Sequence, residues 1–196
     1  LPPATSGALL VNNFQGGYPQ ERVTQVPSVK IDQVVNSKNK FALLMNRTST
    51  KCDFCAGAEG LPLPAGLLLL TPALDMTQAS DSYRTNRYLD VNLHGGAGDM
   101  PYQYAAGADK IDPYVSPIYG DFSNGWPTTI LSSGTRDLLL SDTVRMHRAL
   151  RRAGIDAELH ITEAGPHGGF MGTAPEDREI LGECKRFIAE RLGTQV

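Results

Sequence analysis

Between residues 66 and 192 the sequence alternates between short apolar runs and amphipathic helical patterns, and this alternation leaves few architectures open to the chain. Apolar runs of strand length lie at residues 66–70, 128–132 and 157–161. A helical pattern follows the second run and ends at Gly154, and another follows the third run after Pro175. Apolar strands that alternate with helices predict an α/β fold, with a mostly parallel sheet flanked by helices.

The helix between the second and third strands carries residue types that are typical of helix ends. Asp142 is a favoured N-cap residue, because its carboxylate can accept hydrogen bonds from the unpaired N–H groups of a first helical turn. Gly154 is a favoured residue just beyond a helix end. We therefore expect Asp142 to cap this helix and Gly154 to end it.

An acid and a histidine follow two of the predicted strands. Asp137 lies beyond the strand at 128–132, and His167 lies beyond the strand at 157–161, in a glycine-rich loop. The carboxyl ends of parallel strands share one edge of the sheet, which is where α/β proteins place their chemistry. Asp followed by His is the order of the last two members of a Ser-Asp-His hydrolase. In such a triad the histidine takes a proton as general base and the acid orients its ring.

The composition of the chain argues against several classes of protein. The chain has 196 residues and is 41% hydrophobic and 20% charged, which is typical of one globular domain. Its net charge of −3 argues against a nucleic-acid partner, and it has no run of 18 apolar residues, so we expect no membrane span. The three cysteines do not form the framework of a secreted disulfide domain. We expect a cytoplasmic protein with no bound metal.

Residues 60–188 resemble the C-terminal part of the hormone-sensitive-lipase-like (GDXG) α/β-hydrolases. The most specific segments are Asp112-Pro113-Tyr114-Val115-Ser116-Pro117, Gly134-Thr135-Arg136-Asp137-Leu138-Leu139-Leu140-Ser141-Asp142 and Gly165-Pro166-His167. The resemblance implies an α/β-hydrolase fold that is incomplete on its N-terminal side. It also implies hydrolysis of short acyl esters, with small-molecule substrates and no cofactor. Because the last strand and helix of this fold often meet a partner in the family, it further suggests a homo-oligomer.

The same resemblance assigns roles to individual residues. It makes Asp137 the acid that orients the imidazole and His167 the general base. Asp142 is a competing acid, but its expected capping role favours Asp137. His147 falls inside a helical pattern and His160 inside a strand pattern, so we expect both to be structural or surface residues.

The nucleophile of the family has no counterpart in this sequence. The family carries its serine in Gly-Asp-Ser-Ala-Gly-Gly, and the matching position falls near residues 41–44, where there is no serine. No Gly-x-Ser-x-Gly occurs anywhere in the chain, and the nearest serines, Ser37, Ser49 and Ser133, lack the flanking glycines that a strained nucleophile turn needs. We therefore divide the chain into residues 1–59, which match the family poorly, and residues 60–196, the C-terminal part of an α/β-hydrolase domain.

Two glycine-rich segments are candidates for the oxyanion hole. Gly16 and Gly17 follow a short apolar run in the expected order, and their backbone N–H groups could bind an oxyanion. The segment from His94 to Gly98 resembles the His-Gly-Gly-Gly loop of the family, but it follows the strand at 66–70 and therefore stands in the wrong order. We interpret it as a glycine turn.

Several explanations of the missing serine stay open. The chain can be a fragment of a longer esterase, or a catalytically dead hydrolase-like protein that binds a small apolar ligand or a partner chain. The sequence of the first sixty residues can also differ from the native one. A thiol-redox function of Cys52 and Cys55 is a weaker alternative, because this pair does not open a clear helix that would stabilise a thiolate.

Overall fold

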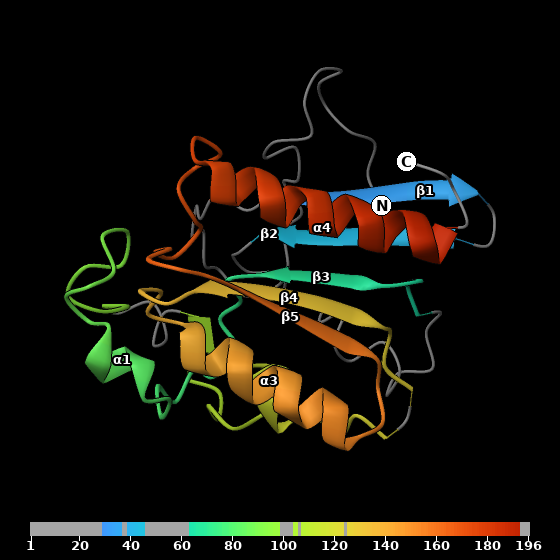
Figure 1. The fold of residues 1–196 in the computed structure, drawn as a ribbon. Coiled ribbons are helices and arrows are strands. Elements are labelled where there is room, and N and C mark those ends of the chain that lie inside the picture. The colour runs from blue at the N-terminus through green and yellow to red at the C-terminus, as the bar shows by residue number, and fades with distance from the viewer. Residues whose placement is uncertain are drawn as a thin grey trace, which may run out of the picture.

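The computed structural model describes residues 29–36, 39–45, 63–98, 104–105, 107–123 and 125–192, the first two ranges as backbone only. These residues build a five-stranded sheet with the order β1-β2-β3-β4-β5 (Figure 1). The strands are β1 (Val29–Asn36), β2 (Asn39–Met45), β3 (Leu67–Leu70), β4 (Thr129–Gly134) and β5 (Ala157–Thr162). The sheet is accompanied by α1 (Ser82–Thr85), the 3-10 helix η2 (Pro117–Tyr119), α3 (Leu140–Arg152) and α4 (Pro175–Leu192).

The sheet is mostly parallel, as the sequence predicts. Strands β2, β3, β4 and β5 pair in parallel, and only β1 pairs antiparallel with its neighbour β2. The four parallel strands therefore end at the same edge of the sheet. Strands β1 and β2 come from before residue 60 but belong to the same sheet, so the division of the chain at that residue stays a prediction.

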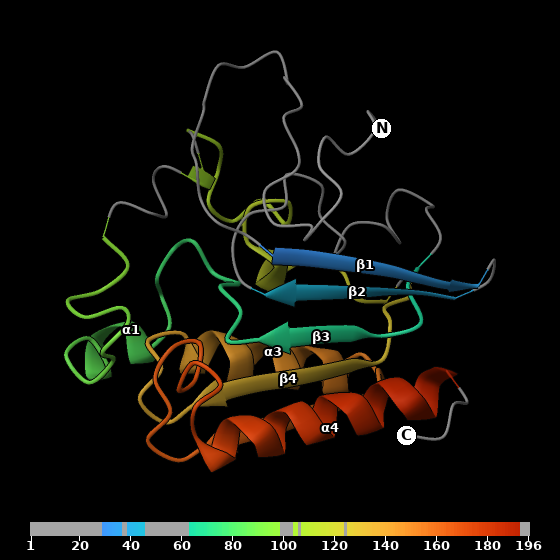
Figure 2. The same ribbon diagram turned by 90° about the horizontal axis from the view of Figure 1, so that it is seen from above.

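Helices α3 and α4 cover opposite faces of the sheet (Figures 1 and 2). On one face, Leu69 and Leu131 belong to the core cluster that includes α3, and on the other face Leu68 and Ile130 pack with Phe187 of α4. Because both faces of β3 and β4 are buried, the leucines of β3 and the pair Ile130-Leu131 of β4 follow one another without polar alternation. No helix in the described part of the chain is long and apolar enough to cross a bilayer.

The expected capping role of Asp142 is wrong. Helix α3 begins at Leu140, with Leu139 at the N-cap, so Asp142 lies inside the first turn. Its fully buried carboxylate instead accepts hydrogen bonds from the backbone N–H groups of Leu74 and Asp75, each at 3.1 Å. The side chain binds the segment that follows β3, where buried N–H groups need an acceptor.

Candidate active site

Asp137 and His167 lie side by side at the carboxyl edge of the sheet. Asp137 follows β4 and His167 follows β5, and the ends of these strands are paired in register at Gly134 and Thr162. One carboxylate oxygen of Asp137, Oδ1, lies 3.2 Å from Nδ1 of His167. The Asp137 side chain is fully buried, whereas the His167 side chain keeps 12% of its surface exposed. The two residues that the strand-end argument selected are thus in contact.

A glycine pair allows the two loops to meet. A Cβ atom built on Gly134 would lie 1.9 Å from the carbonyl oxygen of Gly165, which is far inside van der Waals contact. The same carbonyl accepts a hydrogen bond from the backbone N–H of Arg136 at 3.1 Å. The hydroxyl of Thr135 accepts another from the N–H of Ala164 at 2.8 Å. The contact between Asp137 and His167 therefore depends on the close approach of the main chain at Gly134 to the main chain at Gly165, and a side chain at Gly134 would prevent this approach.

Further hydrogen bonds fix the carboxylate of Asp137. Its Oδ2 accepts a bond from the hydroxyl of Ser133 at 2.6 Å, and its Oδ1 accepts one from the backbone N–H of Leu139 at 2.9 Å. Asn86 holds the main chain of the same loop, since its side-chain amide donates to the carbonyl of Asp137 at 2.8 Å. Ser133 is thus a support of the acid, which argues against this serine as the nucleophile.

The contact with Asp137 determines how the imidazole can be used. An ionised carboxylate only accepts hydrogen bonds, so Nδ1 of His167 is the donor in this pair. The other ring nitrogen, Nε2, is then the atom suited to take a proton from a nucleophile. This arrangement can perform general base chemistry.

Asp142, the competing acid, belongs to a different network. Its carboxylate accepts hydrogen bonds from the hydroxyl of Ser80 and from the hydroxyl of Tyr83, the latter at 3.3 Å. Arg145 bridges Ser80 and Asp75, each contact being 2.6 Å long. Burial, assisted by the negative charge of Asp75, raises the pKa of Asp142 to about 6. These contacts make Asp142 an anchor between α3 and the segment after β3.

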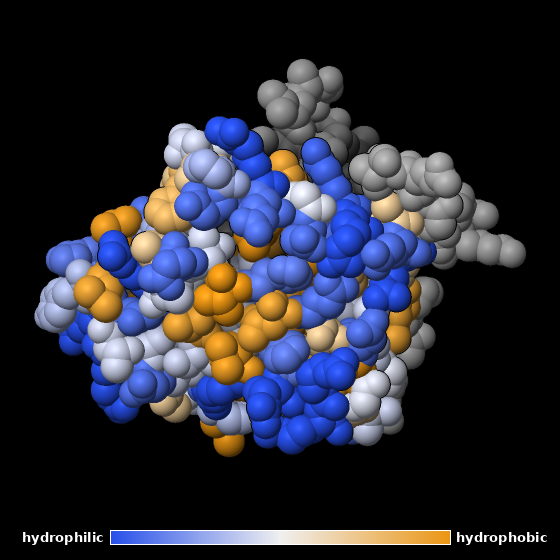
Figure 3. Space-filling model, viewed as in Figure 1, coloured by the Kyte–Doolittle hydropathy of each residue, from blue (hydrophilic) through white to orange (hydrophobic). Residues whose placement is uncertain are grey.

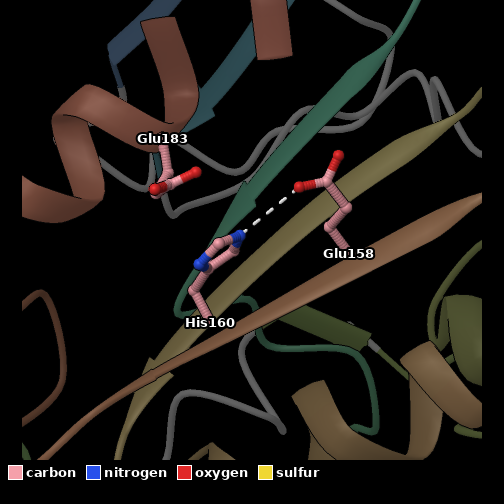
Figure 4. A group of neighbouring side chains, drawn as sticks. All are labelled: Glu158, His160 and Glu183. Carbon is pink, nitrogen blue, oxygen red and sulfur yellow. Dashed lines mark ion pairs between the residues drawn. The ribbon is translucent and has the colours of Figure 1, made fainter. Parts of the chain in front are cut away.

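A second group of titratable side chains joins β5 to α4. Glu158 and His160 of β5 and Glu183 of α4 point toward one another, with ligand atoms within 4.8 Å (Figure 4). Their spacing could suit a metal ion. However, the guanidinium of Arg186 already binds Glu158 at 2.5 Å and Glu183 at 2.8 Å. A metal would have to displace this cation, so we interpret the group as an ion-pair network.

The remaining predicted residues fall into two sets. The first set lies outside the described residues: Gly16, Gly17, Ser37, Ser49, Cys52 and Cys55. The second is described: Gly95, Gly96 and Gly98 all have positive φ angles, as a glycine turn requires. His147 contacts the carbonyl oxygen of Ala157 at 3.2 Å, a structural contact between α3 and β5.

Sequence reasoning missed three residues that support Asp137 and His167. They are Ser133, which binds Asp137, Asn92, which binds the loop of His167, and Asp90, which binds both loops. The position of Ser133, four residues before the predicted acid, was a usable signal. Asp90 and Asn92 had no comparable signal, because they lie in a polar turn far away in the sequence.

Known proteins share this architecture. A family model described as "alpha/beta hydrolase fold" matches residues 49–171. The chain is 29% identical over 141 residues to an acetyl-hydrolase of Streptomyces hygroscopicus, a match that covers 68% of this chain and 46% of that protein. It is 39% identical to the solved esterase E25, with a TM-score of 0.65 and coverage of 70% of this chain and 43% of that chain. A solved hormone-sensitive lipase from a metagenome library is 31% identical, with a TM-score of 0.62 and coverage of 69% and 47%. The chain spans less than half the length of each of these proteins.

Proposed function

The chain belongs to the alpha/beta hydrolase fold family, and from this premise we propose that it acts in the hydrolysis of carboxylic esters. The resemblance to hormone-sensitive-lipase-like hydrolases is confirmed by the solved relatives. The observation that carries the proposal is the 3.2 Å contact between a buried Asp137 and a partly exposed His167 at the carboxyl edge of the sheet.

In the proposed reaction a serine attacks the ester carbonyl while Nε2 of His167 takes its proton. Asp137 holds the imidazole and stabilises the imidazolium that forms. Backbone N–H groups, for which Gly16 and Gly17 are our candidates, bind the oxyanion. His167 then returns the proton to the leaving alcohol, which leaves an acyl-serine. Water, deprotonated by Nε2 of His167, attacks this acyl-serine, and the proton returns to the serine as the carboxylic acid leaves. The step needs no cofactor, and the family resemblance favours short acyl esters as substrates.

Labelling with a fluorophosphonate probe, followed by peptide mass spectrometry, tests this proposal. We expect an adduct on one serine in the native chain and none in the His167→Ala variant. Ser133→Ala is the matched control, because Ser133 bonds to the acid and should not be the labelled residue. Strand β2 ends at Met45 on the same edge as β3, so the segment after β2, which includes Ser49 and lies outside the described residues, is the first peptide to inspect.

A second candidate function is that of a hydrolase-like binding protein, or of one piece of a longer esterase. The observations that favour it are the missing Gly-x-Ser-x-Gly and the short span of the chain relative to its relatives. No adduct on a folded sample would support this alternative. An adduct that persists in the His167→Ala variant would contradict the proposed role of His167.

Three further predictions from the sequence stay proposals. We propose that residues 60–196 form the hydrolase part of the chain, that the protein works in the cytoplasm, and that it forms a homo-oligomer. The last proposal has structural support. Strand β5 is at the end of the strand order, and its Ile161 is 40% exposed. Hydrophobic side chains gather on this face of the molecule (Figure 3).

A further inference from the structure

A short turn between α1 and η2 contains a carboxylate with an unusual environment. Asp90 is fully buried. Its Oδ1 accepts hydrogen bonds from the backbone N–H groups of Asn92 at 2.9 Å and Leu93 at 3.1 Å. These two bonds within the turn fix the orientation of the carboxylate.

The same carboxylate also binds both loops of the candidate site. Its Oδ2 accepts a hydrogen bond from the N–H of Leu138, the residue after Asp137, at 2.7 Å. The N–H of His167 lies 3.3 Å from Oδ2 and 3.4 Å from Oδ1. One buried side chain therefore bonds to the main chain of His167 and to the main chain next to Asp137.

Asn92, from the same turn, binds the carbonyl group of His167, the second polar group of its main chain. Its side-chain amide donates a hydrogen bond to the carbonyl oxygen of His167 at 2.6 Å. The N–H of His167 is bound by Asp90 and its carbonyl by Asn92. The main chain of His167 is thus held at both of its polar groups by a single turn.

The chemistry of Asp90 suits this task better than that of an amide. Within the described residues, all of its hydrogen-bond partners are backbone N–H groups, and none is a lysine or arginine side chain. Burying a carboxylate without a neighbouring cation costs free energy. Each of these N–H donors offsets part of that cost. An asparagine at this position would turn its own NH₂ group toward at least one N–H donor, and that contact is repulsive.

We propose that Asp90 and Asn92 are positioning residues, which set the imidazole of His167 against the carboxylate of Asp137 by holding the two loops together. Neither residue touches the reacting atoms in this proposal. Its catalytic consequence rests on the proposed ester hydrolysis, but its structural consequence does not. A shift of about 1 Å in a catalytic group can lower a rate about a hundredfold, so loss of the turn should reduce kcat.

The test uses the full 196-residue chain with two measurements. The first is NMR of the imidazole Nδ1 proton of His167, which is shifted downfield when it donates to a carboxylate and is assigned by its loss in the His167→Ala variant. The second is steady-state hydrolysis of p-nitrophenyl acetate. For Asp90→Asn we expect the Nδ1 proton signal to broaden or vanish and kcat to fall by about 10- to 100-fold, with KM changed by less than about threefold.

Two further variants serve as a control and as a second test of the proposal. Asp121→Asn is the matched control, because Asp121 makes the same kind of turn bond to Ser123, at 2.9 Å, and is exposed. It should leave the Nδ1 signal and kcat unchanged. Asn92→Ala removes an exposed side chain, so it should fold even if Asp90→Asn does not. We expect it to lower kcat by about 3- to 10-fold and to broaden the Nδ1 signal.

The two measurements separate this proposal from the proposed function. A native chain without turnover, whose Nδ1 signal is lost in Asp90→Asn or broadened in Asn92→Ala, would support the positioning role and contradict ester hydrolysis by this chain. Turnover with an Nδ1 signal and kcat that neither variant changes would overturn the positioning role and leave the hydrolase intact. Absence of the downfield signal from the folded native chain would also overturn it, because His167 would then not be held against Asp137.

Discussion

At the scale of single residues, Asp142 links α3 to the segment after β3 through hydrogen bonds, but its burial disfavours the charged form of its carboxylate. Its carboxylate accepts two backbone N–H groups and two hydroxyls, yet the negative charge of Asp75 adds to the effect of burial and raises its pKa further. Asp75 itself is buried, which alone would raise its pKa, but hydrogen bonds from Arg145 and Thr77 lower that pKa overall. The guanidinium of Arg145 donates its hydrogen bond to Asp75, and Asp142 is the acid whose pKa is raised to about 6.

This difference predicts a pH dependence that belongs to Asp142. Its pKa is about 6 in the folded protein and 3.8 as the ordinary value, so the folded state binds its proton more tightly. The stability that this provides is fully present below pH 3.8 and is lost as the pH rises through about 6. From pH 4 to pH 7 we expect the free energy of unfolding of the native chain to fall by about 2–3 kcal/mol relative to Asp142→Asn.

Urea unfolding of both proteins across this pH range measures the effect. Asp142→Asn is the appropriate reference, because an amide oxygen can still accept from the N–H groups of Leu74 and Asp75 while the titration is gone. Comparing the two proteins at each pH cancels the contributions of all other titrating groups. A difference that stays constant from pH 4 to pH 7 would show that burial of Asp142 does not raise its pKa.

At the scale of elements, the site depends on the close approach of two strand-end loops. Gly134 ends β4, and a methyl group there would overlap the carbonyl oxygen of Gly165. We expect Gly134→Ala to lower the free energy of unfolding by about 2 kcal/mol or more, because neither backbone can move without breaking the ladder between β4 and β5. The same change should separate Asp137 from His167 and remove any activity that depends on their contact.

Thermal or urea unfolding measures this prediction, and the chain offers a matched control. Gly182 lies on the exposed side of α4, and a methyl group added at this residue would meet no atom within 4 Å. Alanine is the better helix former, so Gly182→Ala should stabilise the protein by about 0.5–1 kcal/mol. Equal effects of the two substitutions would contradict the importance of the approach at Gly134.

The elements also show which parts of the fold could be predicted from the sequence. The apolar runs at 66–70, 128–132 and 157–161 correspond to β3, β4 and β5 within two residues at each end, because an apolar run is a local signal. The supports of the site are not local. Asp90 binds the main chain of His167 across 77 positions, and Asp142 binds that of Leu74 across 68. Hydrogen bonds of this range depend on tertiary packing, so residue type alone assigned Asp142 the wrong role.

At the scale of the whole molecule, the chain contains an acid and a histidine in contact, but its sequence has no Gly-x-Ser-x-Gly. Both residues follow parallel strands, and β2 ends at the same edge of the sheet. The order of the parallel strands thus brings the end of β2 to the edge where a third catalytic group would be needed. The chain also spans less than half the length of its solved relatives. The presence or absence of a probe adduct on a serine of this chain therefore decides whether this chain alone can perform the reaction.

The free edge of the sheet predicts how two copies of the chain would associate. Strand β5 is the last strand of the described sheet, so its outer N–H and C=O groups can pair with another strand. Pairing of β5 with a second copy of itself would give a two-fold interface and would cover the exposed Ile161.

We expect the native chain to be dimeric in light scattering and Ile161→Lys to be monomeric, because a buried lysine without a partner opposes association. Ile111→Lys, at a residue that is 55% exposed and outside the sheet, is the control and should stay dimeric. Equal masses of the native chain and both variants would place any association elsewhere on the molecule.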